Sequence, residues 1–315
     1  MRSIDLAGQQ TLGTVLDASV MSADAGCADG ESAHQQSNAP PVCHTGVWVQ
    51  TTGSNLSFSG SNGLNASGFG LLGGGDHAFD VAHVGIEAGF DRTNANDPLG
   101  GFGNAQTAHA GLYSFAPLGP LWLSATADAA YNDYRINRVT GIGNAVASPD
   151  GHTISAGLQA AWPLQFAEWQ LTPKLGALYQ HQSVDGFNES LSSDNPLASA
   201  FAIRSAHTTY TSLQPYGAVA VTRSFVYQGI TYLPELNVGY RYDTRGPTPP
   251  TVQALTQDGS MFPLPGAALG RGLGTAGARI TAEAGASWSL YLGYQGLFAS
   301  HLQDNEFTLG LVKHF

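Results

Sequence analysis

Residues 230–243 read ITYLPELNVGYRYD, a stretch in which apolar and polar side chains alternate along the chain. A period of two is typical of a β-strand whose two faces meet different environments. One face carries the apolar residues Tyr232, Leu236, Val238, Tyr240 and Tyr242, and the other carries Glu235, Asn237, Arg241 and Asp243.

The same alternation recurs from Gly46 onward, in runs of about 9 to 13 residues. Strands of soluble domains average about 5 to 6 residues, whereas a tilted strand needs about 9 to 11 to cross a bilayer. Aromatic side chains gather toward the ends of these runs, as in the girdles of membrane barrels. The pattern predicts an all-β fold, a transmembrane antiparallel β-barrel of about 12 strands. The runs start near Gly46, Gly63, Asp80, Ala105, Leu121, His152, Trp169, Thr208, Ile230, Gly274, Trp288 and Glu306.

The composition fits such a barrel and excludes a helical membrane protein. Charged residues make up only 11% of the chain, against about 25% in an average soluble domain, while the mean hydropathy is −0.07. A mean hydropathy near zero is expected when strands alternate lipid-facing apolar residues with polar or small residues that face the interior, because the contributions of the two faces cancel. The sequence contains no run of about 18 to 20 apolar residues, so a membrane-spanning helix is excluded.

The net charge of −11 argues against a nucleic-acid partner, because there is no basic patch to displace counterions. No G-x-S-x-G elbow, P-loop or H-E-x-x-H motif occurs in the sequence. We therefore expect no metal, no cofactor and no catalytic residues. A barrel enzyme of the protease or lipase type, with an acid–histidine site at a rim, stays open as an alternative.

The N-terminal part of the chain differs from the rest. Apolar positions recur there at helical spacing without an intervening proline, which predicts one helix over about residues 3–22. Residues 23–41 are rich in Ala, Gly, Ser, Gln and Pro, as linkers are. We therefore divide the chain into a leading segment, residues 1–44, and a barrel, residues 45–315. Cys27 and Cys43 fall in the leading segment, where they could form a disulfide or stay two unpaired thiols.

Two other features bear on the strands and their connections. Residues 184–206 and 244–272 are long connections rich in Ser, Pro and Gly. Pro173, Pro215 and Pro234 fall inside three of the runs, and proline removes a ladder donor from a central strand. We expect each proline to lie near the start of its strand, at a barrel rim.

Charged residues on the polar faces of the runs are expected to point into the barrel lumen. The simplest interpretation is mutual salt bridging in a wet interior, and a second is contact with the leading helix along a hydrated path for a passing chain. The residues that alternation assigns to the lumen are Glu87, Asp91, Asp128, Lys174, Glu235, Arg241, Asp243, Arg279 and Glu283.

The order of several segments resembles the autotransporter β-domain family over roughly residues 46–315. The matching segments are GVWVQTTG at Gly46, DGHTISAGLQAAW at Asp150, WQLTPKLGALYQHQSVDGFNES at Trp169, ITYLPELNVGYRYD at Ile230, SWSLYLGYQG at Ser287 and EFTLGLVKHF at Glu306. The resemblance implies a type V secretion translocator in the outer membrane of a Gram-negative bacterium, with long loops facing the cell exterior. It also implies that the N-terminal helix threads the lumen, and that a passenger polypeptide carried in cis is exported to the cell surface without a catalysed reaction.

The chain ends in a strand that is similar to the assembly signal of outer-membrane proteins. Phe307, Leu309, Leu311 and Phe315 share one face of it, while Lys313 stands where an apolar residue is usual. A lysine near a strand end can extend its ammonium group to the membrane interface. The resemblance implies the barrel-assembly machinery, periplasmic chaperones and outer-membrane lipid as partners.

Some family members cut the linker helix at an asparagine inside the barrel, but no asparagine lies between Ser3 and Ala23. We therefore expect no self-cleavage of that kind. No signal peptide is visible after Met1, so we expect a further part upstream that carries the passenger. A simple channel is a third alternative, beside the enzyme.

Overall fold

The computed structural model describes residues 13, 15, 16, 45–59, 63–79, 82–192, 201–245, 251–255, 260–265, 271–285 and 287–315. Within these ranges, twelve long strands form one antiparallel sheet. Their bounds are β1 Gly46–Phe58, β2 Leu64–Phe79, β3 Ala82–Asn96, β4 Phe102–Leu118, β5 Leu121–Thr140, β7 Asp150–Ala161, β9 Trp169–Val184, β13 Thr208–Arg223, β15 Ile230–Tyr242, β18 Gly272–Ala284, β19 Trp288–Phe298 and β20 Leu302–His314.

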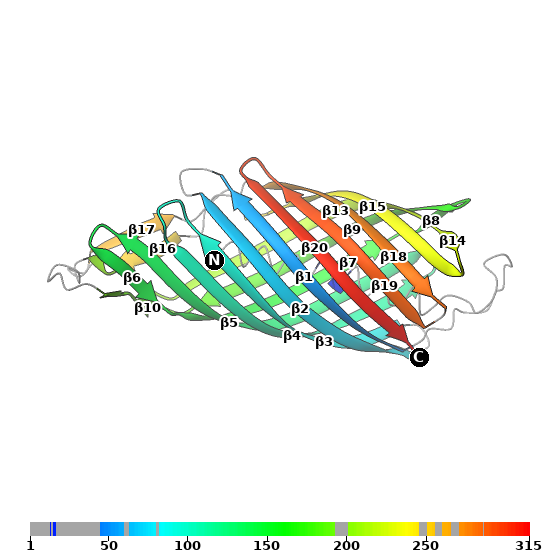
Figure 1. The fold of residues 1–315 in the computed structure, drawn as a ribbon, viewed down its shortest axis with the longest axis horizontal. Helices are drawn as coiled ribbons and strands as arrows, with labels where there is room; N and C mark the ends of the chain where they lie inside the picture. The colour runs from blue at the N-terminus through cyan, green and yellow to red at the C-terminus, as the bar shows by residue number, and fades with distance from the viewer. Residues whose placement is uncertain are drawn as a thin grey trace.

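The sheet closes on itself because β1 pairs with both β2 and β20. Around the barrel the order is β1-β2-β3-β4-β5-β7-β9-β13-β15-β18-β19-β20, so each long strand pairs with its chain neighbours. The strands are steeply tilted against the long axis of the molecule (Figure 1). The predicted twelve-stranded barrel is confirmed. Its predicted strand start at Asp80 lies outside the described residues, and β3 is described from Ala82.

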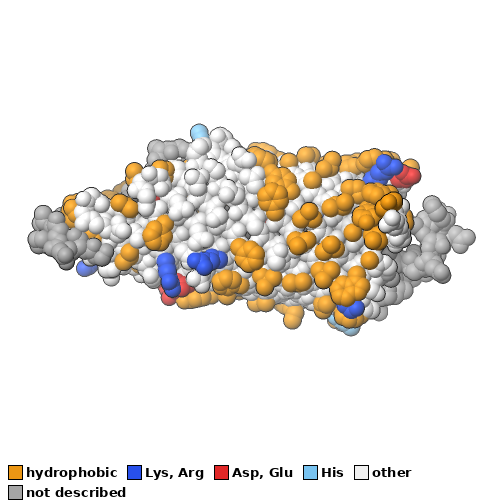
Figure 2. Space-filling model, in the orientation of Figure 1, with side chains coloured by type: hydrophobic (Ala, Val, Ile, Leu, Met, Phe, Trp, Pro, Cys, Tyr) orange, Lys and Arg blue, Asp and Glu red, His pale blue; other side chains and the backbone are white. Residues whose placement is uncertain are grey.

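The outer surface of the barrel is apolar along much of its length. On β20, for example, Phe307, Leu309 and Leu311 are exposed while the intervening Glu306 and Thr308 are buried. Exposed aliphatic and aromatic side chains occur on every long strand. Figure 2 shows these side chains gathered over the half of the barrel that holds the chain's C-terminus. An apolar band of this kind is stable only against lipid, since in water its exposure would be costly.

The two ends of the barrel differ in their connections. At the end where β1 begins and β20 ends, turns are short, and β8 (Leu164–Phe166) and β14 (Phe225–Tyr227) only lengthen two hairpins. The other end carries further short strands, which extend the structure beyond the barrel (Figure 1). They are β6 Gly143–Ala147, β10 Phe187–Asn188, β11 Ser190–Ser192, β12 Arg204–Ser205, β16 Thr251–Leu255 and β17 Met261–Pro265.

Four of these short strands form a second sheet in the order β10-β12-β16-β17. The sequence predicts only loops over residues 184–206 and 244–272, so the sheet is an unpredicted element. The bidentate ion pair of Arg138 with Glu189, at 3.1 and 2.6 Å, ties the β5–β6 hairpin to this region. Arg138 also donates to the Phe201 carbonyl at 2.8 Å.

The three prolines lie where the ladder to one neighbouring strand is interrupted. Pro173 and Pro234 are each the fifth residue of their strand, as predicted, but Pro215 is the eighth of the sixteen residues of β13. The prediction that all three lie near a strand start is therefore wrong for Pro215. Pairing of β13 with β15 begins only at Tyr216, so the missing N–H of Pro215 falls beyond the end of that ladder.

Little of the leading segment is described. Of the predicted helix over residues 3–22, Gly13, Val15 and Leu16 are described and are helical. The rest of that prediction lies outside the described residues, as do Cys27 and Cys43. No helix in the described part of the chain is long and apolar enough to cross a membrane.

Candidate functional site in the barrel interior

The lumen is lined with polar side chains, because every second residue of each strand points inward. Buried inward residues include glutamines, threonines, serines and charged groups on most of the long strands. Examples are Gln50 on β1, Ser124 and Thr126 on β5, Gln180 and Gln182 on β9, Ser212 and Gln214 on β13, and Asp304 and Glu306 on β20. Such a lining suits a hydrated interior rather than a dry core.

An acidic cluster around His109 occupies one wall of the lumen. His109 on β4 lies 3.1 Å from Asp91 of β3 through Nε2 and 3.1 Å from Asp128 of β5 through Nδ1. The carboxylate of Glu87 lies beside them and accepts a 3.5 Å hydrogen bond from the Thr126 hydroxyl. Two carboxylates thus contact one histidine and a third lies beside them, which leaves this wall acidic.

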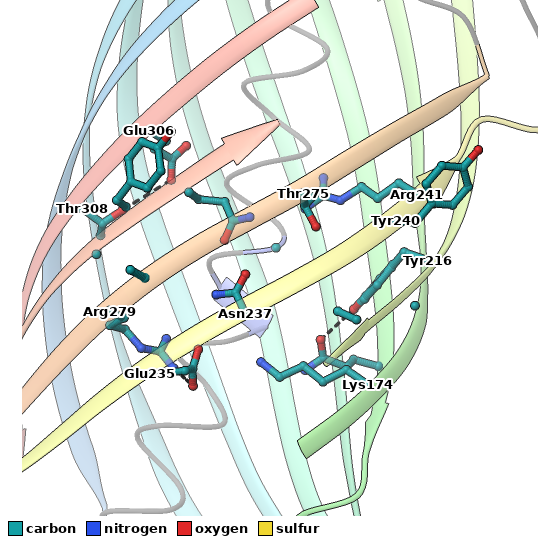
Figure 3. Close-up of a pocket in the computed structure, with 18 of the residues that line it drawn as sticks. Lys174, Tyr216, Glu235, Asn237, Tyr240, Arg241, Thr275, Arg279, Glu306 and Thr308 are labelled. Carbon is teal, nitrogen blue, oxygen red and sulfur yellow. Dashed lines mark hydrogen bonds and ion pairs between the residues drawn. The ribbon is translucent and has the colours of Figure 1, made fainter. Parts of the chain in front are cut away.

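A basic cluster occupies another wall and lines a solvent-open cavity of about 1020 Å³. Its cations are Lys174 of β9, Arg241 of β15 and Arg279 of β18. Arg279 forms an ion pair of 2.9 Å with Glu235, and both side chains are largely buried. Figure 3 shows this pair and the side chains of Lys174 and Arg241 around the same cavity, into which Glu306 and Thr308 reach from β20.

The acidic and basic clusters face each other across the barrel. His109 stands on β4 and Arg279 on β18, and six strand-to-strand steps separate β4 from β18 in the closed order of twelve. Six steps are half of the circumference, so the two strands are diametrically opposed. The acidic wall carries three carboxylates around His109, whereas three cations and two carboxylates line the basic cavity, so the two walls differ in charge.

The described helical residues lie between these walls. Val15 is buried in one apolar cluster with side chains of β1, β2, β4, β19 and β20, and Leu16 in another with Leu178 of β9 and Tyr216 of β13. Gly13 lines the basic cavity, close to the Arg241 guanidinium. These three residues therefore fill part of the lumen and touch both its apolar and its charged lining. The first cluster contains Trp48, Leu72, Tyr113, Tyr291 and Val312.

A hydrogen-bonded network braces the lumen near the barrel end where the chain terminates. The Trp48 indole donates to the Tyr113 hydroxyl at 2.7 Å, and that hydroxyl donates to Asp76 at 3.0 Å. The other Asp76 oxygen lies 3.2 Å from His83 Nδ1. The Tyr113 ring lies so close to Gly85 that a Cβ on that residue would overlap it. This network joins β1, β2, β3 and β4 from the inside.

The structure distributes the nine residues assigned to the lumen over several places. Lys174, Glu235, Arg241 and Arg279 meet around the basic cavity, and Glu87, Asp91 and Asp128 meet around His109. Asp243 is buried at the far end of β15, where it accepts a 3.4 Å bond from the Tyr210 hydroxyl. Glu283 is half-buried near the other end of β18, away from both clusters.

His109 and the Asp76–His83 pair were not assigned to the lumen from the sequence. Alternation along β3 and β4 could have done so for the two histidines, because it points both of them inward. Close acid–histidine contacts therefore exist, but inside the barrel rather than at the rim bearing the long connections. At that rim the Ser183 hydroxyl lies 2.7 Å from His207. Among the described residues no carboxylate contacts His207, and no group of three or more His, Cys, Asp or Glu residues could hold a metal.

The four residues of the expected assembly signal face outward. Phe307, Leu309, Leu311 and Phe315 are 59, 50, 38 and 66% exposed. The Lys313 ammonium lies 4.4 Å from the centre of the Trp288 ring and 5.3 Å from that of Phe315. Lys313 is thus held against two aromatic rings at the edge of the apolar band.

The comparisons with known proteins agree with this geometry. The family model of the autotransporter β-domain matches residues 47–295. The fold is similar to the translocator domain of the autotransporter NalP from Neisseria meningitidis, with a TM-score of 0.74, 14% identity, and coverage of 99% of this chain and 98% of that one.

Two further structures share the architecture. For the β-domain of the Bordetella autotransporter BrkA the TM-score is 0.64 at 15% identity, covering 86% of this chain and 100% of that one. For the transport unit of AIDA-I from Escherichia coli it is 0.58 at 15% identity, covering 96 and 98%. No curated protein matches the chain in sequence. The chain belongs to the autotransporter β-domain family and is an outer-membrane translocator for the export of a passenger polypeptide.

Proposed function

We propose that residues 1–44 form a leading segment whose helix, over about residues 3–22, stays in the lumen of the barrel (residues 45–315) as a plug. The burial of Val15 and Leu16 in two apolar clusters of the lumen wall is the observation that carries this proposal. The polar lining and the charged residues Glu87, Asp91, Asp128, Lys174, Glu235, Arg241, Asp243, Arg279 and Glu283 would give a passing chain a hydrated path, and they hold the helix afterwards.

The plug is tested by conductance in planar bilayers. Deleting residues 1–44 should raise the conductance of the barrel, because the lumen would then hold only water and ions. Equal conductance of the two chains would favour a simple channel and contradict the plug.

We propose further that the end with β6, β10, β12, β16 and β17 faces the cell exterior. The uneven lengths of the connections support this, since outer-membrane barrels have short periplasmic turns and long external loops. Cysteines introduced at Leu99, which is 84% exposed in the β3–β4 connection, and at Gln228 in a short turn would test the orientation.

Both variants would carry Cys27→Ser and Cys43→Ser, so that only the introduced thiol reacts. A membrane-impermeant maleimide should label whole cells at position 99 and spare position 228. Labelling at position 228 alone would show that the barrel has the opposite orientation.

The outward face of β20 supports a role of Phe307, Leu309, Leu311 and Phe315 as the signal read by the barrel-assembly machinery, after periplasmic chaperones have carried the unfolded chain. Deleting Phe315 should lower the amount of barrel in outer-membrane fractions at unchanged synthesis. An unchanged amount would argue that another strand is recognised.

The barrel itself catalyses no reaction in this proposal. Its acid–histidine contacts serve as internal braces, and the Ser183–His207 pair lacks a carboxylate partner among the described residues. An enzyme of the lipase type would require Ser183, so hydrolysis of a fluorogenic ester that disappears in Ser183→Ala would revive that alternative.

A further inference from the structure

Two arginines on the outer surface of the barrel have no protein partner within the described ranges. Arg92 on β3 and Arg135 on β5 are exposed, and neither guanidinium makes an ion pair or hydrogen bond to another described residue. Arg138, Arg223 and Arg279, by contrast, each hold a carboxylate at 2.6 to 2.9 Å. In a chain with a net charge of −11, two neighbouring exposed cations without a carboxylate partner among the described residues are available to an anionic ligand.

The strand register places the two arginines side by side. Arg92 pairs with Gln106 and Arg135 with Asn104, so only β4 separates them. Two strand spacings make about 10 Å across the sheet, within reach of two arginine side chains. Between them lie the side-chain amides of Asn94, Asn104 and Gln106, and Asn104 Nδ2 donates to Asn94 Oδ1 at 2.8 Å.

The pair stands at one edge of the apolar band. Phe90 and Tyr131 are large exposed apolar residues on the outer faces of β3 and β5, and Arg92 and Arg135 follow them toward the end with the long connections, where Val139 is one further exposed apolar residue of β5. In Figure 2 basic side chains, with an acidic one beside them, stand where the hydrophobic surface gives way to a polar one. This level corresponds to the headgroups of a lipid leaflet.

We propose that Arg92 and Arg135 bind the phosphate groups of a phosphorylated glycolipid in the leaflet at this edge. The proposal rests on the orientation proposed above, which makes that leaflet the outer one. Arginine forms paired, charge-assisted hydrogen bonds with phosphate oxygens, and its weakly hydrated fork suits an interface. The amides of Asn94, Asn104 and Gln106 are positioned to bind sugar hydroxyls of the same headgroup.

Acidic neighbours limit how anions approach the pair. Asp133 lies opposite Gln106 on β5, two residues before Arg135, and Asp150 of β7 is its partner on the other side. Neither carboxylate forms an ion pair with the two arginines. Their charge repels phosphate from the β5–β7 side, so the headgroup should sit over β3 and β4.

The experiment measures lipid binding to the full chain in neutral detergent micelles by native mass spectrometry, with lipid A as the probe. The Arg92→Gln/Arg135→Gln variant should bind lipid A about 30-fold more weakly, since each cation near an anionic headgroup contributes roughly a factor of five. Asp133→Asn should tighten binding. Arg223→Gln, which removes an exposed arginine at the opposite rim, should leave the affinity unchanged and serves as the matched control.

The other arms separate the sources of phosphate. Dephosphorylated lipid A should bind as weakly to the parent protein as lipid A binds to the double variant, and inorganic phosphate should not compete. Equal affinity of the parent and the double variant, or effective competition by phosphate, would overturn the lipid site. Retention of the folded band in unheated gels shows that each variant is a barrel. Because micelles have no sidedness, a negative result in this experiment would not bear on the orientation of the barrel, which the maleimide labelling tests separately.

Discussion

Val15 and Leu16 are neighbours in the chain, yet they pack against opposite walls of the barrel. Val15 joins the cluster around Trp48 on β1, and Leu16 joins Leu178 on β9, six strand-to-strand steps away. A single turn of helix therefore reaches across the lumen. This relationship supports the proposed plug over an open channel.

Truncating Leu16 should loosen the plug. Leu16→Ala removes a fully buried side chain, which costs about 2–5 kcal/mol, so the open fraction of the pore should rise about tenfold or more. Single-channel recording measures this fraction. Leu292→Ala on the lipid-facing side of β19, where the residue is 55% exposed, should not change it, and equal opening in both variants would contradict the account.

The close approach of Gly85 and Tyr113 predicts a packing defect. In Gly85→Val the new side chain would displace the Tyr113 ring and break its bonds to Trp48 and Asp76. The expected loss is about 1–3 kcal/mol, visible as a lower temperature at which the folded band disappears in gels. Gly53→Ala is the control, because no atom lies within 4 Å of a Cβ there. Equal transition temperatures for both variants would show that Tyr113 can move without cost.

The Arg279–Glu235 pair predicts a coupled pair of substitutions. Arg279→Ala leaves the Glu235 carboxylate largely buried without its ion-pair partner, which should destabilise the barrel by about 1–3 kcal/mol. Adding Glu235→Gln should recover most of that loss, because the remaining amide carries no charge. Urea unfolding in lipid vesicles provides the double-mutant cycle. Strictly additive losses would mean that the lumen water screens both charges.

The outward face of β20 predicts an effect that depends on depth in the membrane. Leu309→Arg places a cation in the apolar band, at a cost of about 2–4 kcal/mol near the bilayer midplane. Gln303→Arg on the same face, beyond that band, should cost roughly 0–1 kcal/mol, as near an interface. Unfolding free energies in vesicles distinguish the two, and equal values would contradict the assignment of this face to lipid.

The barrel could be predicted from sequence because alternation of side chains is a direct consequence of strand geometry. The predicted starts at Gly46, Trp169 and Thr208 coincide with the observed ones, and Glu306 was placed four residues late because Asp304 and the polar residues beside it hide the alternation. Alternation also predicts that His109 points into the lumen. Its contacts with Asp91 and Asp128 could not be predicted, because they depend on how β3, β4 and β5 are aligned with one another. Register depends on the turns and is not encoded in any single strand.

The remaining features depend on contacts between distant segments. The β10-β12-β16-β17 sheet joins two connections that lie far apart in sequence, and its strands of two to five residues are too short for periodicity to show. Pro215 was misplaced for a similar reason, since the end of the β13–β15 ladder at Tyr216 follows from how those two strands pair.

The most direct test of the proposed plug is a disulfide between the leading segment and the wall of the lumen. Leu16→Cys and Leu178→Cys, in a chain that also carries Cys27→Ser and Cys43→Ser, would join two residues that share a buried cluster. Under mild oxidation in outer-membrane vesicles, the double-cysteine chain should form an intramolecular disulfide. The same treatment with Leu178→Cys replaced by the lipid-facing Leu292→Cys should not. Absence of the first crosslink in a folded barrel would contradict the claim that this segment occupies the lumen.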